Sequence, residues 1–152
     1  MRVPLLALVL VGCTNADLKG HYWNIAIQGD ADECTGGNAQ YNDKLEYRVV
    51  FDGNDITMAV ATDEFATGST NGCSIVYESV IWEDTREGFD IRWQIQGSAT
   101  VNVGGGKSCQ PGNGTDWDGT ETFEVVSSED PDISPGCQYT LKLSGKYVEE
   151  VK

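Results

Sequence analysis

The sequence predicts an all-β domain, an antiparallel meander of about seven or eight strands. Apolar and polar residues alternate with period two in several runs, and short turn signals separate these runs. No stretch shows a sustained apolar period of 3.6, which would indicate an amphipathic helix. Because each strand has one apolar face, the meander must close into a small barrel or stack as a β-sandwich, and the pattern leaves both open.

The first residues precede this domain and are typical of an export signal. Arg2 supplies a positive charge, and Val3–Val11 is apolar but too short to span a bilayer as a helix. The run ends in Leu10-Val11-Gly12-Cys13, which resembles the lipobox of bacterial lipoproteins, although the segment before the cysteine is shorter than usual. The resemblance implies that residues 1–12 are a signal peptide that is removed and that Cys13 receives acyl chains.

A lipidated Cys13 implies a protein anchored to a membrane of the bacterial cell envelope, since several acyl chains on one residue give stable anchoring. Thr14 follows the cysteine, where lipoproteins of the inner membrane often carry Asp, so the resemblance points to the outer membrane. Residues 13–19 would form a short tether. Residues 20–152 would form a single all-β domain.

The cysteine count agrees with this interpretation. The chain has five cysteines, so one would be left over if all the others paired. With Cys13 lipidated, an even set remains, and outside the cytoplasm it can form two disulfides. These residues are Cys34, Cys73, Cys109 and Cys137. Sequence does not choose among the three connectivities, and we prefer Cys34–Cys73 with Cys109–Cys137. A metal site is disfavoured because the chain has no C-x-x-C pair and one histidine.

The strands of the domain follow the alternation in chain order. The expected strands are Tyr22–Gln28, Leu45–Phe51, Ile56–Val60, Ile75–Ile81, Phe89–Gln96, Thr120–Ser127 and Tyr139–Tyr147. Asp52-Gly53-Asn54 and Thr85-Arg86-Glu87-Gly88 are hairpin signals between successive runs. A Gly-rich stretch from Gly104 to Gly114 and the segment Ser127–Gly136 are the expected long loops.

One short motif carries a second resemblance. Gly20-His21-Tyr22-Trp23 resembles the glycine-x-tryptophan signature near the start of lipocalin-like barrels, with one extra residue before the tryptophan. This resemblance implies a barrel whose inward side chains fill the core or surround an apolar ligand. The residues expected to face such a ligand are Trp23, Tyr47, Phe51, Ile75, Tyr77, Phe89, Trp93 and Leu141.

Charge and motifs exclude several kinds of function. The formal net charge of −14 argues against nucleic-acid binding, which depends on Lys and Arg. Asp116, Asp118 and Glu121 could serve a calcium site, but at the EF-hand spacing Gly114 and Val125 would occupy ligand positions, which favours a solvated loop. We find no catalytic motif and no cofactor motif, and we expect the protein not to be an enzyme.

Two hypotheses about function remain. The first is a lipid-anchored structural or interaction domain of the envelope, with a protein partner. The alternative is a carrier that holds a small apolar ligand inside a barrel. A carrier needs an interior cavity with an open mouth, whereas a structural domain needs a filled core.

Overall fold

The computed structural model describes residues 18–36, 41–102 and 116–152. In this part of the chain it forms β-strands and turns. The strands are β1 (Gly20–Asp32), β2 (Asn42–Asp52), β3 (Asp55–Val60), β4 (Asp63–Asn71), β5 (Ser74–Ser79), β6 (Trp82–Arg86), β7 (Phe89–Asn102), β8 (Asp116–Ser128) and β9 (Gln138–Val151). The described residues include no helix that is long and apolar enough to cross a membrane. The predicted signal peptide and Cys13 lie outside the described residues.

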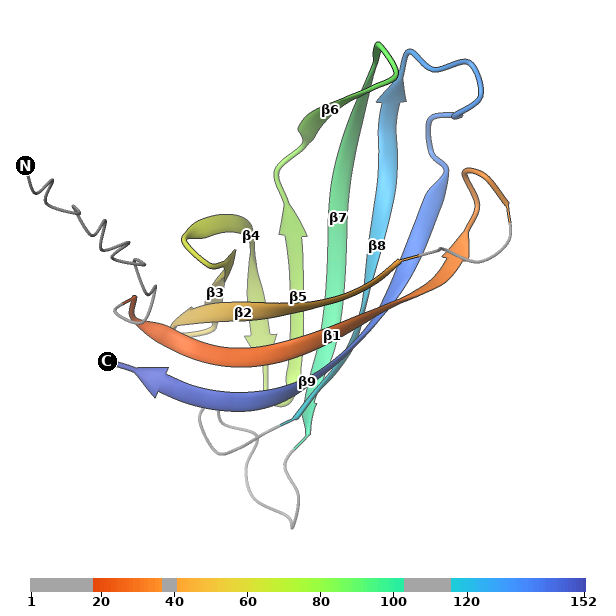
Figure 1. Cartoon of the computed structure of the whole chain (residues 1–152). Coiled ribbons are helices and arrows are strands. Elements are labelled where there is room, and N and C mark those ends of the chain that lie inside the picture. Colours follow the sequence, from red (N-terminus) through yellow and green to blue (C-terminus); the bar gives the residue numbers. More distant parts are fainter. Residues whose placement is uncertain (1–17, 37–40, 103–115) are drawn as a thin grey trace, which may run out of the picture.

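The strands form one antiparallel sheet that closes on itself. Neighbouring strands follow the order β5-β4-β3-β2-β1-β9-β8-β7-β6, and β5 also pairs with β7. The pairing of β1 with β9 joins the two ends of the chain, and the pairing of β5 with β7 completes the ring (Figure 1). The all-β prediction is therefore confirmed. Of the two architectures left open by the sequence, the barrel is the one observed, with β6 as an additional strand.

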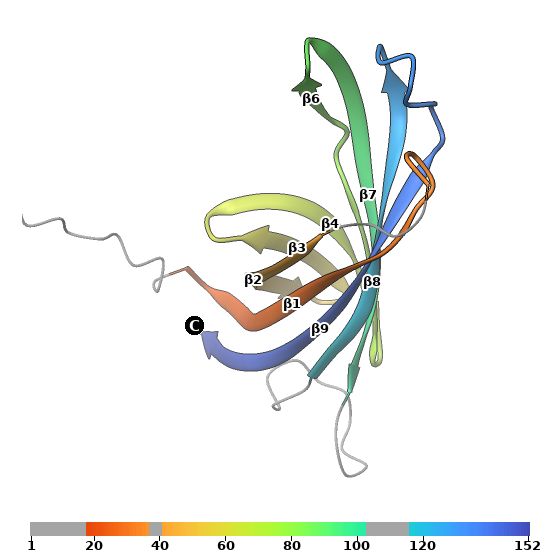
Figure 2. The same ribbon diagram turned by 45° about the vertical axis from the view of Figure 1, so that its right-hand side comes forward.

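The barrel has an extension at one end. The second half of β7 pairs with β5, from Thr100 to Gln96, whereas its first half pairs with β6, from Trp93 to Phe89. Figures 1 and 2 show β6, β7 and β8 reaching beyond β2, β3 and β4. A register shift between Arg92 and Trp93 in the pairing with β8 lies where β7 passes from the barrel into this extension.

Ser79 stabilises the break between β5 and β6. Its hydroxyl accepts a hydrogen bond from the backbone N–H of Ile95 at 2.8 Å, and its carbonyl accepts one from the Gln94 side chain at 3.2 Å. These bonds occupy groups that would otherwise lack ladder partners between the two pairings of β7. Val80 and Ile81 follow with exposed side chains.

The end of the barrel opposite the extension is filled. Trp23 and Trp117 are fully buried and pack edge to face with their ring centroids 5.5 Å apart. Tyr147 packs against Trp23, and Val49 and Met58 are fully buried in the same cluster. The lone histidine, His21, also lies at this end, 3.2 Å from the Tyr147 hydroxyl. Edge-to-face packing of these large rings fills this part of the core.

The predicted hairpins are present, but two strands were not predicted. The chain turns at Gly53-Asn54 between β2 and β3, and at Glu87-Gly88 between β6 and β7. Gly53, Glu87 and Gly88 all have positive φ, as tight hairpin turns require. Strands β4 and β6 lack a clear apolar alternation because they are rich in polar and small residues. They are strands because neighbouring strands supply hydrogen-bond partners.

The expected disulfide pairing is wrong. Cys34 is bonded to Cys137, 103 residues away in the sequence. Cys34 follows β1 and Cys137 precedes β9, and these strands are antiparallel neighbours, with Asp32 opposite Tyr139. The closure of the barrel therefore brings together two cysteines that we had paired with nearer ones. Cys73 is also disulfide-bonded, and Cys109 lies outside the described residues.

Candidate functional site

A cavity of about 560 Å³ lies in the half of the barrel next to the extension. We call it the barrel cup. Most of its lining is apolar or aromatic and comes from every strand of the barrel or the segments that join them. Its lining residues are Ile27, Tyr41, Leu45, Tyr47, Val60, Ala61, Asp63, Glu64, Phe65, Ser79, Val80, Trp82, Ile95, Glu121, Phe123, Tyr139 and Leu141. Ala61, Asp63, Glu64 and Val80 are exposed and mark the mouth.

A buried carboxylate forms part of the inner wall of the cup. Glu121 lies in β8, where Trp117, Phe123 and Val125 alternate with it and point to the same inner face. Its side chain is 2% exposed. Buried carboxylates are costly unless they are hydrogen-bonded, so this residue marks a site with a specific local structure.

Two tyrosines hold one oxygen of this carboxylate. The hydroxyls of Tyr47 in β2 and Tyr77 in β5 both donate to Oε1 of Glu121, at 2.8 Å and 2.7 Å. Three strands that are far apart in the sequence thus meet at one atom. Among the described residues, no group donates a hydrogen bond to the other oxygen, Oε2. The carboxylate is fixed in orientation and keeps one oxygen for another partner.

Gly97 allows Tyr77 to reach Glu121. It lies opposite both residues, since Tyr77 pairs with Gly97 across β5–β7 and Glu121 pairs with Gly97 across β7–β8. A Cβ atom at Gly97 would lie 2.0 Å from the Cζ atom of the Tyr77 ring. The absence of a side chain therefore lets the ring lie across β7 with its hydroxyl at the carboxylate.

Burial dominates the acid–base behaviour of this group. It raises the pKa of Glu121 above its ordinary value, and the hydrogen bonds from Tyr77 and Tyr47 oppose the shift by stabilising the ionised form. Burial, with the nearby carboxylate, also raises the pKa of both tyrosines far above the physiological range. Both hydroxyls therefore remain protonated donors.

Aromatic rings continue from the cup onto the extension. Phe123 stacks on Tyr139 with ring centroids 4.6 Å apart, and Trp82 meets Phe123 edge to face at 6.0 Å. Trp93 packs against Tyr139 at 5.5 Å, within a second small core that also contains Ile91 and Val125. Together these contacts form an aromatic wall on one side of the cup, next to the Cys34–Cys137 disulfide.

The residues expected to face a ligand have different positions. Tyr47 and Leu141 line the cup. Trp23, Ile75, Tyr77 and Trp93 are buried in the two cores, and Phe51 packs against the larger core while partly exposed. Phe89 is 38% exposed, so its prediction as an interior residue is wrong. It lies on the same face of β7 as Ile91 and Trp93, as expected, but it begins β7 at the far end of the extension, where the barrel does not surround it.

The three acids considered for a calcium site do not lie together. Glu121 points into the barrel, whereas Asp118 is exposed on the outer face and Asp116 forms an ion pair with Lys146. Successive residues of a strand project to opposite sides, so these three acids do not converge. Among the described residues, no group of three or more His, Cys, Asp or Glu side chains is placed to hold a metal ion.

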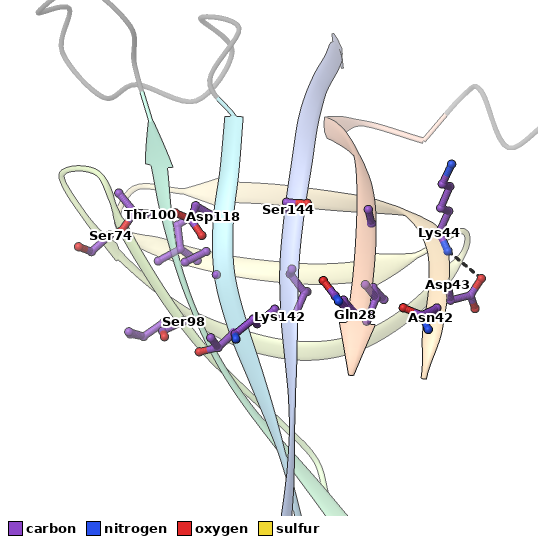
Figure 3. Close-up of a pocket in the computed structure, with 18 residues that line it drawn as sticks. Gln28, Asn42, Asp43, Lys44, Ser74, Ser98, Thr100, Asp118, Lys142 and Ser144 are labelled. Atoms are coloured by element: carbon purple, nitrogen blue, oxygen red, sulfur yellow. Dashed lines mark hydrogen bonds between the residues drawn. The ribbon is translucent and has the colours of Figure 1, made fainter. Parts of the chain in front are cut away.

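A second hollow, of about 1180 Å³, lies on the outer face of the sheet, across β2, β1, β9, β8, β7 and β5 (Figure 3). The side chains around it are mostly small or polar and exposed, as Ser74, Ser98, Thr100 and Ser144 show. We call it the outer groove. Its inward-pointing members, such as Ile75 and Leu143, belong to the core. No buried polar side chain lines this groove among the described residues, so the barrel cup is the better candidate site.

Glu121 was not predicted as part of an interior site. The available signal was the alternation of Trp117, Gly119, Glu121, Phe123 and Val125, which places an acid at an inward position of a strand. The chain matches no family model, no curated protein and no solved structure.

Proposed function

We propose that this protein is a carrier that binds a small ligand with a flat, largely apolar body in the barrel cup. The observation that carries the proposal is the cup itself, a mouth-bearing cavity of about 560 Å³ inside a closed sheet. Ligand sites are typically concave, roughly 300–1,000 Å³ in volume, and mostly apolar with a few placed polar groups. The cup has these properties, and its buried acidic group is Glu121.

The alternative, a structural or interaction domain, requires a filled core. The half of the barrel around Trp23 and Trp117 meets that description. The other half keeps a cavity although Trp82, Phe123 and Tyr139 are available to close it. One half of the barrel is filled, and the other half keeps a cavity. This difference favours the carrier, because the strands and the disulfide maintain a cavity that stability of the fold does not require.

Binding of the neutral fluorescent dye N-phenyl-1-naphthylamine to the full-length protein tests the proposal. We expect saturable binding with one site and a blue-shifted emission. Leu45→Trp adds a ring at the wall of the cup and should weaken binding by about tenfold or more. Val76→Trp is the matched control, because Val76 is exposed and lines the outer groove rather than the cup. Absence of saturable binding, or a loss in Val76→Trp alone, would contradict the proposal.

We also propose that the carrier is anchored to a membrane of the bacterial envelope, in agreement with the lipobox resemblance at Cys13. Lipidation would hold the barrel near the membrane surface by its filled end, since the first strand begins there at Gly20. Replacing Cys13 with Ser should move the protein from the membrane fraction to the soluble fraction of cells. If Cys13→Ser stays in the membrane fraction, the anchoring proposal is wrong, and the carrier proposal is unaffected.

A further inference from the structure

The polar chemistry of the cup is asymmetric. Oε1 of Glu121 accepts the hydroxyls of Tyr47 and Tyr77, while Oε2 has no donor among the described residues. A carboxylate oxygen accepts hydrogen bonds, so its natural partner is a donor. The surrounding wall offers none at this atom, and a ligand that enters the cup can supply it.

The charged side chains that line the cup are all acidic. Its described lining contains three carboxylates, those of Asp63, Glu64 and Glu121, and no Lys, Arg or His. Asp63 and Glu64 are exposed at the mouth, whereas Glu121 is buried deeper. The whole chain has a formal net charge of −14. A cleft lined by one sign of charge concentrates ligands of the opposite sign.

The walls are suited to the same class of ligand. Tyr47, Phe65, Trp82, Phe123 and Tyr139 present rings to the cup. The faces of aromatic rings attract cations, and they also pack well against flat apolar groups. Neutral or anionic ligands would gain from the packing but not from the charge.

We propose that the ligand of the barrel cup is an organic monocation, an amine on an aromatic or similarly flat apolar body, whose ammonium group donates to Oε2 of Glu121. This inference rests on the proposed carrier function and specifies its ligand class. The tyrosines act as positioning residues that orient the carboxylate. The aromatic wall holds the body of the ligand.

The protonation of Glu121 gives the proposal a pH signature. Burial raises the pKa of Glu121, and an ammonium group beside it would lower that pKa again. Amine affinity should therefore fall as the pH drops through the raised pKa of the free protein, because the cation needs the ionised carboxylate. The titratable groups that face Glu121 are Tyr41, Tyr47, Tyr77 and Tyr139, with Asp63 and Glu64 at the mouth. The tyrosines stay neutral in this range because their pKa values are raised.

Calorimetric titration of the full-length protein with three ligands of one shape tests this. The probes are 2-(1-naphthyl)ethylamine, 2-(1-naphthyl)ethanol and 3-(1-naphthyl)propanoate. At neutral pH we expect the amine to bind about tenfold or more tighter than the alcohol, with the carboxylate weakest. Equal binding of all three would overturn the ligand class and leave the carrier proposal standing. No binding of any probe, including the neutral dye, would contradict both.

Variants localise the effect. Glu121→Gln keeps the size of the side chain and an acceptor for the tyrosines, and should reduce amine affinity about tenfold, to the level of the alcohol. Glu46→Gln removes an exposed charge on the outer face of β2, away from the cup, and should change it by less than about threefold. Unchanged amine binding in a folded Glu121→Gln would overturn the proposal. If that variant fails to fold, the affinities of the unaltered protein for the amine and for the alcohol are measured at several pH values. The same pH dependence for both ligands would overturn the proposal.

Discussion

Removal of the Cys34–Cys137 disulfide should strongly destabilise the barrel. The bond closes a loop with a sequence separation of 103, across the junction where β1 meets β9. In the chain-entropy model, a cross-link over a loop of this length lowers the entropy of the unfolded chain enough to add about 4.7 kcal/mol to stability. Because the dependence is logarithmic, halving the effective loop through a second cross-link would change this by only about 0.6 kcal/mol.

The double variant Cys34→Ser/Cys137→Ser tests this magnitude. Urea unfolding followed by tryptophan fluorescence, without reductant, should give a free energy of unfolding lower by about 4–5 kcal/mol. The melting temperature should fall by roughly 10–20 °C. The double alanine variant is the control, since it removes the same cross-link with a different side chain. A loss below about 1.5 kcal/mol in both variants would show that closure of this loop contributes little to stability, contrary to the prediction.

Two further predictions concern Glu121 and its support. Gly97→Ala should lower the free energy of unfolding by about 1–3 kcal/mol and weaken amine binding, because the new Cβ displaces the Tyr77 ring. Urea unfolding measures the stability, and Ser98→Ala on the outer face is the control. The pKa of Glu121 in the folded protein lies above the ordinary value of 4.5. Between 4.5 and this raised pKa, the folded state binds more protons than the unfolded state, so the free energy of unfolding falls as the pH rises. The stability of Glu121→Gln relative to the unaltered protein should therefore increase with pH across this window, measured by urea unfolding at several pH values; a constant difference would contradict the burial of an ionisable carboxyl.

The sequence predicted the elements whose side chains alternate clearly. Phe89–Gln96 and Leu45–Phe51 lie within β7 and β2, and the Gly53 turn joins β2 to β3 as expected. Strands β4 and β6 escaped because polar and small residues weaken their alternation, and pairing with neighbours decides their conformation. The barrel itself depends on the β1–β9 and β5–β7 pairings, which join distant segments and leave no local pattern.

The candidate site was harder to predict for a related reason. We assigned Asp116, Asp118 and Glu121 to a solvated loop because the EF-hand spacing did not fit a calcium site, yet Glu121 lies on the inner face of β8 and is buried. Its partners Tyr47 and Tyr77 are 74 and 44 residues away, and only the closed sheet brings them together. Phe89 shows the opposite error. It lies on the inward face of β7, but it is exposed because the strand extends beyond the barrel at that point.

The most direct test of the central claim is a crystal structure of the full-length protein with 2-(1-naphthyl)ethylamine. We expect the naphthalene ring in the barrel cup beside Phe123 and Tyr139, with the ammonium nitrogen about 2.7–2.9 Å from Oε2 of Glu121. A ligand bound in the outer groove, or one in the cup with its ammonium group turned away from Glu121 toward solvent, would contradict it.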